Sequence, residues 1–327
     1  MPTRRQVLSQ ALALCCTLPS ARGALAQGGS RPLVLVVGFP PGGGTDIIAR
    51  IVAERLHVPF ASAVIVENKP GAAARASVDF VKNAEPDGHV ALFTPDFPIT
   101  VYPHSFRSLS YDPLRDLVPV ATTARSMLTY SVGPMVPANV TSLADFVQWC
   151  RQNPAHASYA TTAAGGTPHF VGVMLANAAG LTMTPVHYRG GAPALQDLMG
   201  GHVPASINPI SETLSFAHSG SLRILGVTGS ERSPFLPEVP TMREQGFDVV
   251  VAGWLGAFLP AKTPNEIVRA LADAIGEALK APDMAAALAK FGNVPSFQGP
   301  DEFAATVKAD LARWGPVVKA SGFVAVD

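Results

Sequence analysis

A glycine-rich stretch near the start of the chain has residue types that suit the binding of a small anion. Phe39-Pro40-Pro41-Gly42-Gly43-Gly44-Thr45-Asp46 lies between a β-branched run and a segment with helical spacing. Consecutive glycines let the backbone approach another group and expose its N–H groups. The start of a helix adds unpaired N–H donors and a partial positive charge. The alternative is a tight turn with Thr45 or Asp46 as helix cap, and these residues alone favour neither interpretation.

A second stretch in the middle of the chain repeats this arrangement. Thr161-Thr162-Ala163-Ala164-Gly165-Gly166 precedes Thr167-Pro168-His169 and an apolar segment. Thr167 is a good N-cap, and Pro168 suits the first turn of a helix. We call residues 39–46 loop 1 and residues 161–169 loop 2. If the two loops face each other in the folded protein, they would bind the carboxylates of one ligand from both sides. A third helix start, after Tyr188, would then line the same site.

Motifs of nucleotide binding and of catalysis are absent. Gly44 is followed by Thr45 and Asp46 rather than by Lys and a hydroxyl residue, and the G-x-G-x-x-G spacing does not occur. The sequence also contains no H-E-x-x-H, C-x-x-C or G-x-S-x-G pattern. We therefore expect a small anionic ligand, no cofactor, no metal and no catalytic residue.

Three side chains outside the glycines remain candidates for chemistry. His169 is either a general base or, more commonly for a lone histidine, a packing or hydrogen-bonding residue. Asp96, in Thr94-Pro95-Asp96-Phe97, either binds a ligand amine or hydroxyl or closes an Asx-turn. Cys150, beside Trp149 on an apparent helix, fits a core thiol better than a nucleophile.

The first 27 residues have the organisation of a secretory signal peptide. Two arginines precede a short apolar stretch from Val7 to Leu18, and Ala24-Leu25-Ala26 fits a cleavage site. Residues 3–8 also fit the twin-arginine pattern, which leaves both export routes open. Cleavage near Ala26 would leave Cys150 as the single cysteine, without a disulfide partner. We expect a periplasmic protein.

The charge balance argues against nucleic acid as a partner. Lys and Arg together number 24, as do Asp and Glu. The leader carries three arginines and no acidic residue, so the mature chain is slightly acidic. Nucleic-acid binding depends on concentrated basic surface, which this composition does not supply.

Apolar patterning predicts alternating strands and helices. The run Leu33–Val37 is typical of a strand buried on both faces, and short strands and helices alternate after it, which favours an α/β sheet with crossover helices. The last predicted helix is Pro300–Ala320, an amphipathic segment with proline near its first turn. The mature chain exceeds the usual size of a single core, so two lobes are expected. Residues 127–132 and 249–259 are the candidate hinge crossovers. Lobe 1 would then comprise residues 28–126 plus 254–327, and lobe 2 residues 127–253.

The ordered motifs along the chain resemble the Bug family of periplasmic solute-binding proteins, which serve tripartite tricarboxylate transporters. The resemblance covers nearly the whole mature chain. The fragments that carry it include loop 1 with Ala49-Arg50, Val66-Glu-Asn-Lys-Pro-Gly71, Pro86-Asp-Gly88, Gly166-Thr-Pro-His169, Val186-His-Tyr-Arg-Gly190, Asp197-Leu-Met-Gly-Gly201, Pro237-Glu-Val-Pro-Thr241 and Trp254. The chain departs from the family at Gly71-Ala-Ala-Ala-Arg75, where the family is richer in glycine, and at Pro41, where it often has alanine.

The resemblance implies a type II-like binding protein with two α/β lobes, mixed and mainly parallel sheets, and two hinge crossovers. Its partners would be a small carboxylate ligand and the membrane components of the transporter, and we expect a monomer. The alternatives are a ligand-presenting sensor for a membrane kinase and a periplasmic enzyme using His169 and Asp96. The expected ligand-binding residues are Phe39, Pro40, Gly42, Gly43, Gly44, Thr45, Asp46, Thr94, Asp96, Thr162, Gly165, Gly166, Thr167, His169, Tyr188 and Asn208.

Overall fold

The computed structural model describes residues 31–323. The predicted signal peptide, residues 1–27, lies outside the described residues. Within the described part of the chain, no helix has the length and apolar character needed to cross a membrane.

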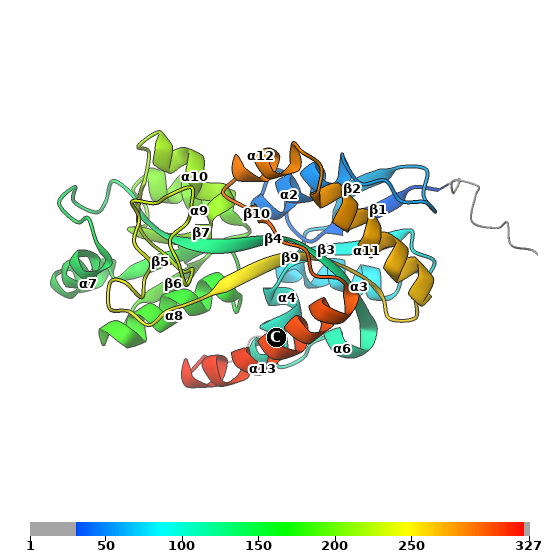
Figure 1. Cartoon of the computed structure of the whole chain (residues 1–327). Helices are drawn as coiled ribbons and strands as arrows, with labels where there is room; N and C mark the ends of the chain where they lie inside the picture. The colour runs from blue at the N-terminus through cyan, green and yellow to red at the C-terminus, as the bar shows by residue number, and fades with distance from the viewer. Residues whose placement is uncertain (1–30, 324–327) are drawn as a thin grey trace, which may run out of the picture.

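The strands form two curled halves that meet along two long strands (Figure 1). The order is β2-β1-β3-β9-β4-β7-β5-β6, and β8 and β10 also pair with β4. We call sheet 1 the half with β2, β1, β3, β9, β10 and the first part of β4. Sheet 2 is the half with the last part of β4, β7, β8, β5 and β6. The pairs β1–β2, β1–β3, β5–β6 and β5–β7 are parallel, and every pair made by β4 or β9 is antiparallel. The predicted α/β class is confirmed.

Sheet 1 positions loop 1. Its first strand ends directly before the loop because a run of apolar residues gives way to glycine and proline, and the amphipathic helix α2 then packs Ile48, Ala49 and Val52 into the core. Its strands and flanking helices are β1 (Leu33–Val37), α2 (Gly44–Ala53), β2 (Val64–Asn68), η1 (Ala72–Ala74), α3 (Arg75–Lys82), β3 (Val90–Pro95), α4 (Phe97–Thr100), α5 (Tyr102–Ser105), α6 (Pro113–Asp116), β9 (Ala252–Pro260), α11 (Asn265–Leu279), α12 (Met284–Ala289), β10 (Val294–Pro295) and α13 (Pro300–Ala320).

Sheet 2 positions loop 2 between β5 and α8. Buried aromatic residues of this half, among them Tyr130, Phe146, Tyr159 and Phe170, form one continuous core. Its elements are β4 (Leu117–Val132, shared), α7 (Leu143–Gln152), η2 (Pro154–His156), β5 (Ser158–Thr161), α8 (Thr167–Ala179), β6 (Thr184–His187), α9 (Gly191–Met199), β7 (Ala205–Pro209), α10 (Ile210–His218) and β8 (Arg223–Val227).

The two chain segments predicted as crossovers fall largely in strands. β4 pairs with β9 as far as Met127 and with β7 from Leu128 onward, so one strand serves both sheets. Val251 donates its N–H to the carbonyl oxygen of Thr228 in sheet 2, and β9 begins in sheet 1 at Ala252. The chain therefore passes between the halves twice, along neighbouring extended segments that carry the same hydrogen-bonded sheet (Figure 1).

Candidate functional site

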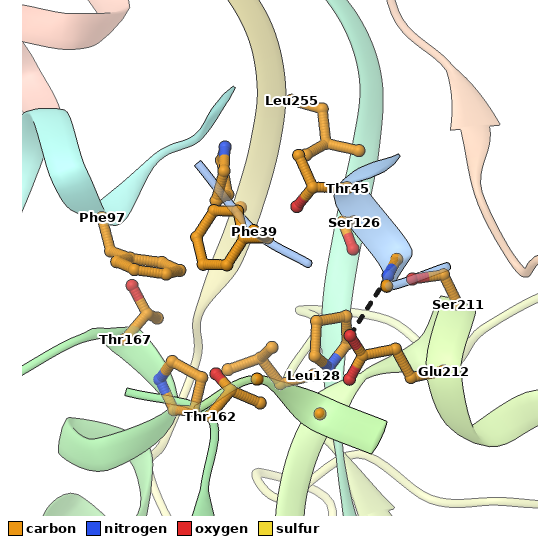
Figure 2. A pocket seen from close by; sticks show the side chains of 18 of the residues that line it. Phe39, Thr45, Phe97, Ser126, Leu128, Thr162, Thr167, Ser211, Glu212 and Leu255 are labelled. Carbon is orange, nitrogen blue, oxygen red and sulfur yellow. Dashed lines mark hydrogen bonds between the residues drawn. The ribbon is translucent and has the colours of Figure 1, made fainter. Parts of the chain in front are cut away.

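A small cavity of about 100 Å³ lies where the two halves face each other (Figure 2). Both loops contribute to its walls, together with the N-termini of α9 and α10 and with β4 and β9. Most of the lining is apolar, and Phe39 and Phe97 meet edge to face with their ring centres 5.8 Å apart. The polar side chains on the lining are Thr45, Asp96, Ser126, Thr162, Thr167, Arg189, Ser211 and Glu212.

Asp46 holds loop 1 in shape. Its buried carboxylate accepts hydrogen bonds from the Gly42 N–H (2.8 Å), from Asn68 Nδ2 (2.8 Å) and from Arg50 Nε (3.0 Å). Burial alone would raise the pKa of Asp46, but the bonds from Arg50, Gly42 and Asn68 outweigh it and lower the pKa below its ordinary value. The side chain is absent from the cavity lining, so its role in this structure is to brace the loop.

Glu212 forms a hydrogen bond with the first residue of α2, at the helix start of loop 1. Glu212 belongs to the first turn of α10, in the opposite half of the molecule, and its Oε1 accepts the Gly44 N–H at 3.2 Å (Figure 2). Asn208 donates to Oε2 at 3.0 Å. Removal from water raises the pKa of Glu212, while the bonds from Asn208 and Gly44 oppose that rise. A carboxylate of the protein therefore lies at the point where the sequence predicted a bound anion.

Two glycines leave room for Glu212 and for the neighbouring Ser211. A Cβ at Gly191, the first residue of α9, would lie 1.7 Å from Glu212 Oε2. A Cβ at Gly44 would lie 2.4 Å from Ser211 Oγ. With a Cβ at either position, the Glu212 carboxylate or the Ser211 hydroxyl would have to shift, so the present positions of these two side chains depend on Gly191 and Gly44.

Loop 2 is braced by a histidine instead of a carboxylate. Gly165, at φ +68°, donates its N–H to His169 Nδ1 at 3.1 Å, and Ser105 donates to the Gly165 carbonyl oxygen at 2.9 Å. Burial, with a smaller effect of neighbouring His187, lowers the pKa of His169 to about 4. The ring is absent from the cavity lining, which leaves it no position from which to act as a base on a ligand there.

Asp96 lies next to loop 2 on the cavity lining. It is 5% exposed, and its Oδ2 lies 3.5 Å from Thr167 Oγ1. Burial is the main reason that its pKa rises to about 7, with the nearby Asp310 adding to the effect. No salt bridge forms at this carboxyl group within the described residues. Asp96 is therefore a buried acid that lines the cavity and carries no directly paired cation.

An adjoining cavity lies on the other side of the two loops. It is bordered by Ala72, Ala73 and Ala74, all with positive φ. Left-handed conformations cost a residue with a Cβ about 1–2 kcal/mol each. The Ala73 carbonyl oxygen accepts a bond from Tyr102 and that of Ala72 one from Arg75, and these contacts hold the strained turn.

Half of the predicted ligand-binding residues line the main cavity: Phe39, Pro40, Gly43, Gly44, Thr45, Asp96, Thr162 and Thr167. The structure places the other half off its lining: Gly42, Asp46, Thr94, Gly165, Gly166, His169, Tyr188 and Asn208. Gly42, Asp46, Gly165, His169 and Asn208 support the loops or Glu212 through the bonds given above. Thr94 bonds the neighbouring Pro95 carbonyl oxygen, and Tyr188 lines the adjoining cavity and donates to Asp197. In residues 31–323 no cluster of metal-ligating side chains occurs.

Comparison with known proteins identifies the family. Residues 48–323 match the family described as tripartite tricarboxylate transporter family receptor. The chain belongs to this family. It is 34% identical to the UPF0065 protein in the tcbD-tcbE intergenic region of Pseudomonas sp. strain P51, over 96% of this chain and 94% of that protein. It is 32% identical to protein BugT of Bordetella pertussis, over 90% of each. The resemblance to the Bug family is thereby confirmed.

Solved structures of family members share the fold. A Rhodopseudomonas palustris protein determined with adipate superposes with a TM-score of 0.85 at 31% identity, over 90% of this chain and 98% of that one. MatC from Rhodopseudomonas palustris, determined with malate, gives 0.81 at 28% identity, over 88% and 99%. The predicted periplasmic binding protein fold is confirmed.

Sequence reasoning about this receptor did not identify Glu212, Arg189, Ser126 or Ser211 as lining residues. Glu212 and Ser211 lie on α10, a helix whose pattern was not recognised because it follows β7 without an intervening loop. Pro209 and the acidic residue in the first turn were the available signals for that helix start. Ser126 lies in β4, whose sixteen residues include several buried threonines and serines and so lack a clear apolar pattern.

Proposed function

We propose that this receptor captures a small carboxylate-bearing metabolite in the cavity between its halves and delivers it to the membrane components of a tripartite tricarboxylate transporter. The observation that carries the proposal is the cavity itself, which two glycine-rich helix starts border from opposite sheets. Backbone N–H groups at helix N-termini favour negative charge. The family members determined with adipate and malate support a carboxylate as the ligand.

Binding is proposed to close two lobes about β4 and β9. Lobe 1 would comprise residues 28–126 plus 254–327 and lobe 2 residues 127–253, because the chain changes sheets near these boundaries. Hinge closure around a ligand is the usual behaviour of such an arrangement. Small-angle scattering should give a smaller radius of gyration at saturating ligand, and an unchanged radius would contradict closure of a free protein that is open.

The protein is proposed to bind its ligand without converting it. His169, the base that an enzymatic mechanism on this fold would require, uses Nδ1 to accept the Gly165 N–H and is absent from the cavity lining. We further propose that the mature chain is an exported periplasmic monomer. Peptide sequencing of the protein from its native envelope should find a terminus near Gln27, and size-exclusion chromatography with light scattering should give the monomer mass.

A thermal-shift screen against mono-, di- and tricarboxylates tests the binding function, because a ligand that binds only the folded state raises the melting temperature. Isothermal titration calorimetry of each hit should then give one site per chain. If no carboxylate shifts the melting temperature or gives a binding isotherm, the proposed function is wrong.

A further inference from the structure

The helix start of loop 1 is already satisfied by a carboxylate of the protein itself. Glu212 Oε1 accepts the Gly44 N–H, and Oε2 accepts the Asn208 amide, so both oxygens have N–H partners. A Cβ at Gly191 would lie 1.7 Å from Glu212 Oε2, so the present position of this carboxylate depends on the glycine there. The arrangement joins two elements 168 positions apart, which indicates a built contact between the halves.

The cavity lining carries more acidic than basic side chains. Two carboxyl groups, Asp96 and Glu212, line the cavity, and Arg189 is the single basic side chain on the lining. Arg189 is exposed, and within residues 31–323 it forms no salt bridge. The rest of the lining is mainly apolar, from Phe39 and Phe97 at one side to Leu128 and Leu255 near β4 and β9 (Figure 2).

We infer that this receptor selects a monocarboxylate with an apolar body, and that Glu212 excludes dicarboxylates by occupying the position of a second ligand carboxylate. The inference rests on the proposed function and names its ligand class. The ligand carboxylate lies on the loop 2 side of the cavity toward Arg189, where Thr162 offers a hydroxyl group. Its apolar body packs against the aromatic and aliphatic lining.

Two physical effects produce the selectivity. A second ligand carboxylate near α2 would have to displace Glu212 from the Gly44 N–H, and the displaced carboxylate would lose hydrogen bonds in a partly dehydrated site. If Glu212 stayed in place, two like charges would meet at short distance in an environment that screens them weakly. A site that repels the competitor gains specificity without any added contact to the preferred ligand.

Matched pairs of acids test the inference. Calorimetry on the purified mature protein would compare hexanoate with adipate and benzoate with terephthalate, each pair differing in one carboxylate. Wild type should bind the monocarboxylate of at least one pair ten or more times more tightly than its dicarboxylate. Glu212→Ala opens the position beside Gly44, so the affinity for that dicarboxylate should rise at least tenfold, and by more than any change in the affinity for its monocarboxylate partner.

Controls separate this result from unfolding and from a general charge effect. Glu212→Ser serves the same purpose if Glu212→Ala does not fold, as judged by melting curves. Glu238→Ala removes an exposed carboxylate far from the lining and should leave both affinities unchanged. Equal affinity of wild type for both members of every bound pair, or no gain of dicarboxylate affinity in the folded Glu212 variants, overturns the inference and leaves the proposed function standing. If wild type binds none of these four acids, the matched pair is built on a hit of the carboxylate screen, and the proposed function itself fails only if that screen gives no hit.

Discussion

Loops 1 and 2 have the same sequence plan but differ in what holds them and in what they face. Loop 1 is braced by an ionisable carboxylate, Asp46, and its helix start bonds a second carboxylate, Glu212, from the other half. Loop 2 is braced by the imidazole of His169, and its first helical residue faces the nearly unpaired acid Asp96. At loop 1 the N–H group of the helix start is therefore hydrogen-bonded to a carboxylate of the protein. At loop 2 the helix start borders open space in the cavity.

The comparison shows that a glycine-rich helix start is only a potential anion site. Whether it binds a ligand depends on whether another part of the protein already supplies the negative charge. Here the contact through Glu212 links the halves, whereas we propose that the ligand carboxylate binds on the side of loop 2.

The largest expected effect concerns Asp96, which contacts Thr167 of loop 2. Its pKa in the folded protein is about 7, above the ordinary 3.8, so the stability linked to its protonation is present below pH 4 and is lost as the pH rises through 7. Relative to Asp96→Asn, wild type should lose on the order of 4 kcal/mol of unfolding free energy between pH 4 and pH 8. Urea denaturation at a series of pH values measures this, and parallel profiles for the two proteins would contradict it.

Asp46→Ala tests the bracing of loop 1. It removes the acceptor of the Gly42 N–H and of the Asn68 amide and separates Arg50 from its partner. We expect a loss of about 3 kcal/mol in the free energy of unfolding, measured by urea denaturation at pH 7. Asp79→Ala, at a partly exposed carboxylate on α3, is a comparison that should cost less. Equal losses would mean that Asp46 has no special role in the loop.

His169→Ala tests the corresponding brace of loop 2. Loss of the acceptor of the Gly165 N–H should cost about 1–2 kcal/mol at pH 7.5. Because the folded pKa of His169 is about 4, below the ordinary 6.5, its contribution is present above pH 6.5 and is lost as the pH falls toward 4. Denaturation curves at both pH values should therefore show a smaller difference between variant and wild type at pH 4.5.

The smallest expected effect separates two neighbouring glycines of loop 1. Gly42 has φ +78°, so Gly42→Ala should cost about 1 kcal/mol through backbone strain although nothing lies near its Cβ position. Gly43 has φ −74°, which residues with a Cβ adopt readily, so Gly43→Ala should cost less even though its Cβ would lie 3.3 Å from the Pro40 carbonyl oxygen. Melting curves of the two variants provide the comparison, and a larger loss of stability in Gly43→Ala than in Gly42→Ala would contradict this prediction.

Local patterns predicted most elements closely. The strand Leu33–Val37 and the helix Pro300–Ala320 have the expected bounds, because a continuous β-branched run and a proline-initiated amphipathic segment are signals contained in neighbouring residues. Helix α10 and the full length of β4 were missed. β4 contains buried Thr122, Thr129 and Ser131, whose hydroxyls bond within the sheet, and apolar periodicity cannot reveal such a strand.

The sequence by itself determined the two glycine-rich helix starts and the family, because glycine, proline and capping residues act over a few positions. It also contained both carboxylates that bond to loop 1, Asp46 and Glu212, yet it could not assign their roles. Asp46 is four residues from Gly42, and its bond to that N–H is a local turn contact. Glu212 meets Gly44 only because the folded sheets bring α10 against α2 across 168 residues. Which acid braces the loop and which fills its anion position was decided by that long-range packing.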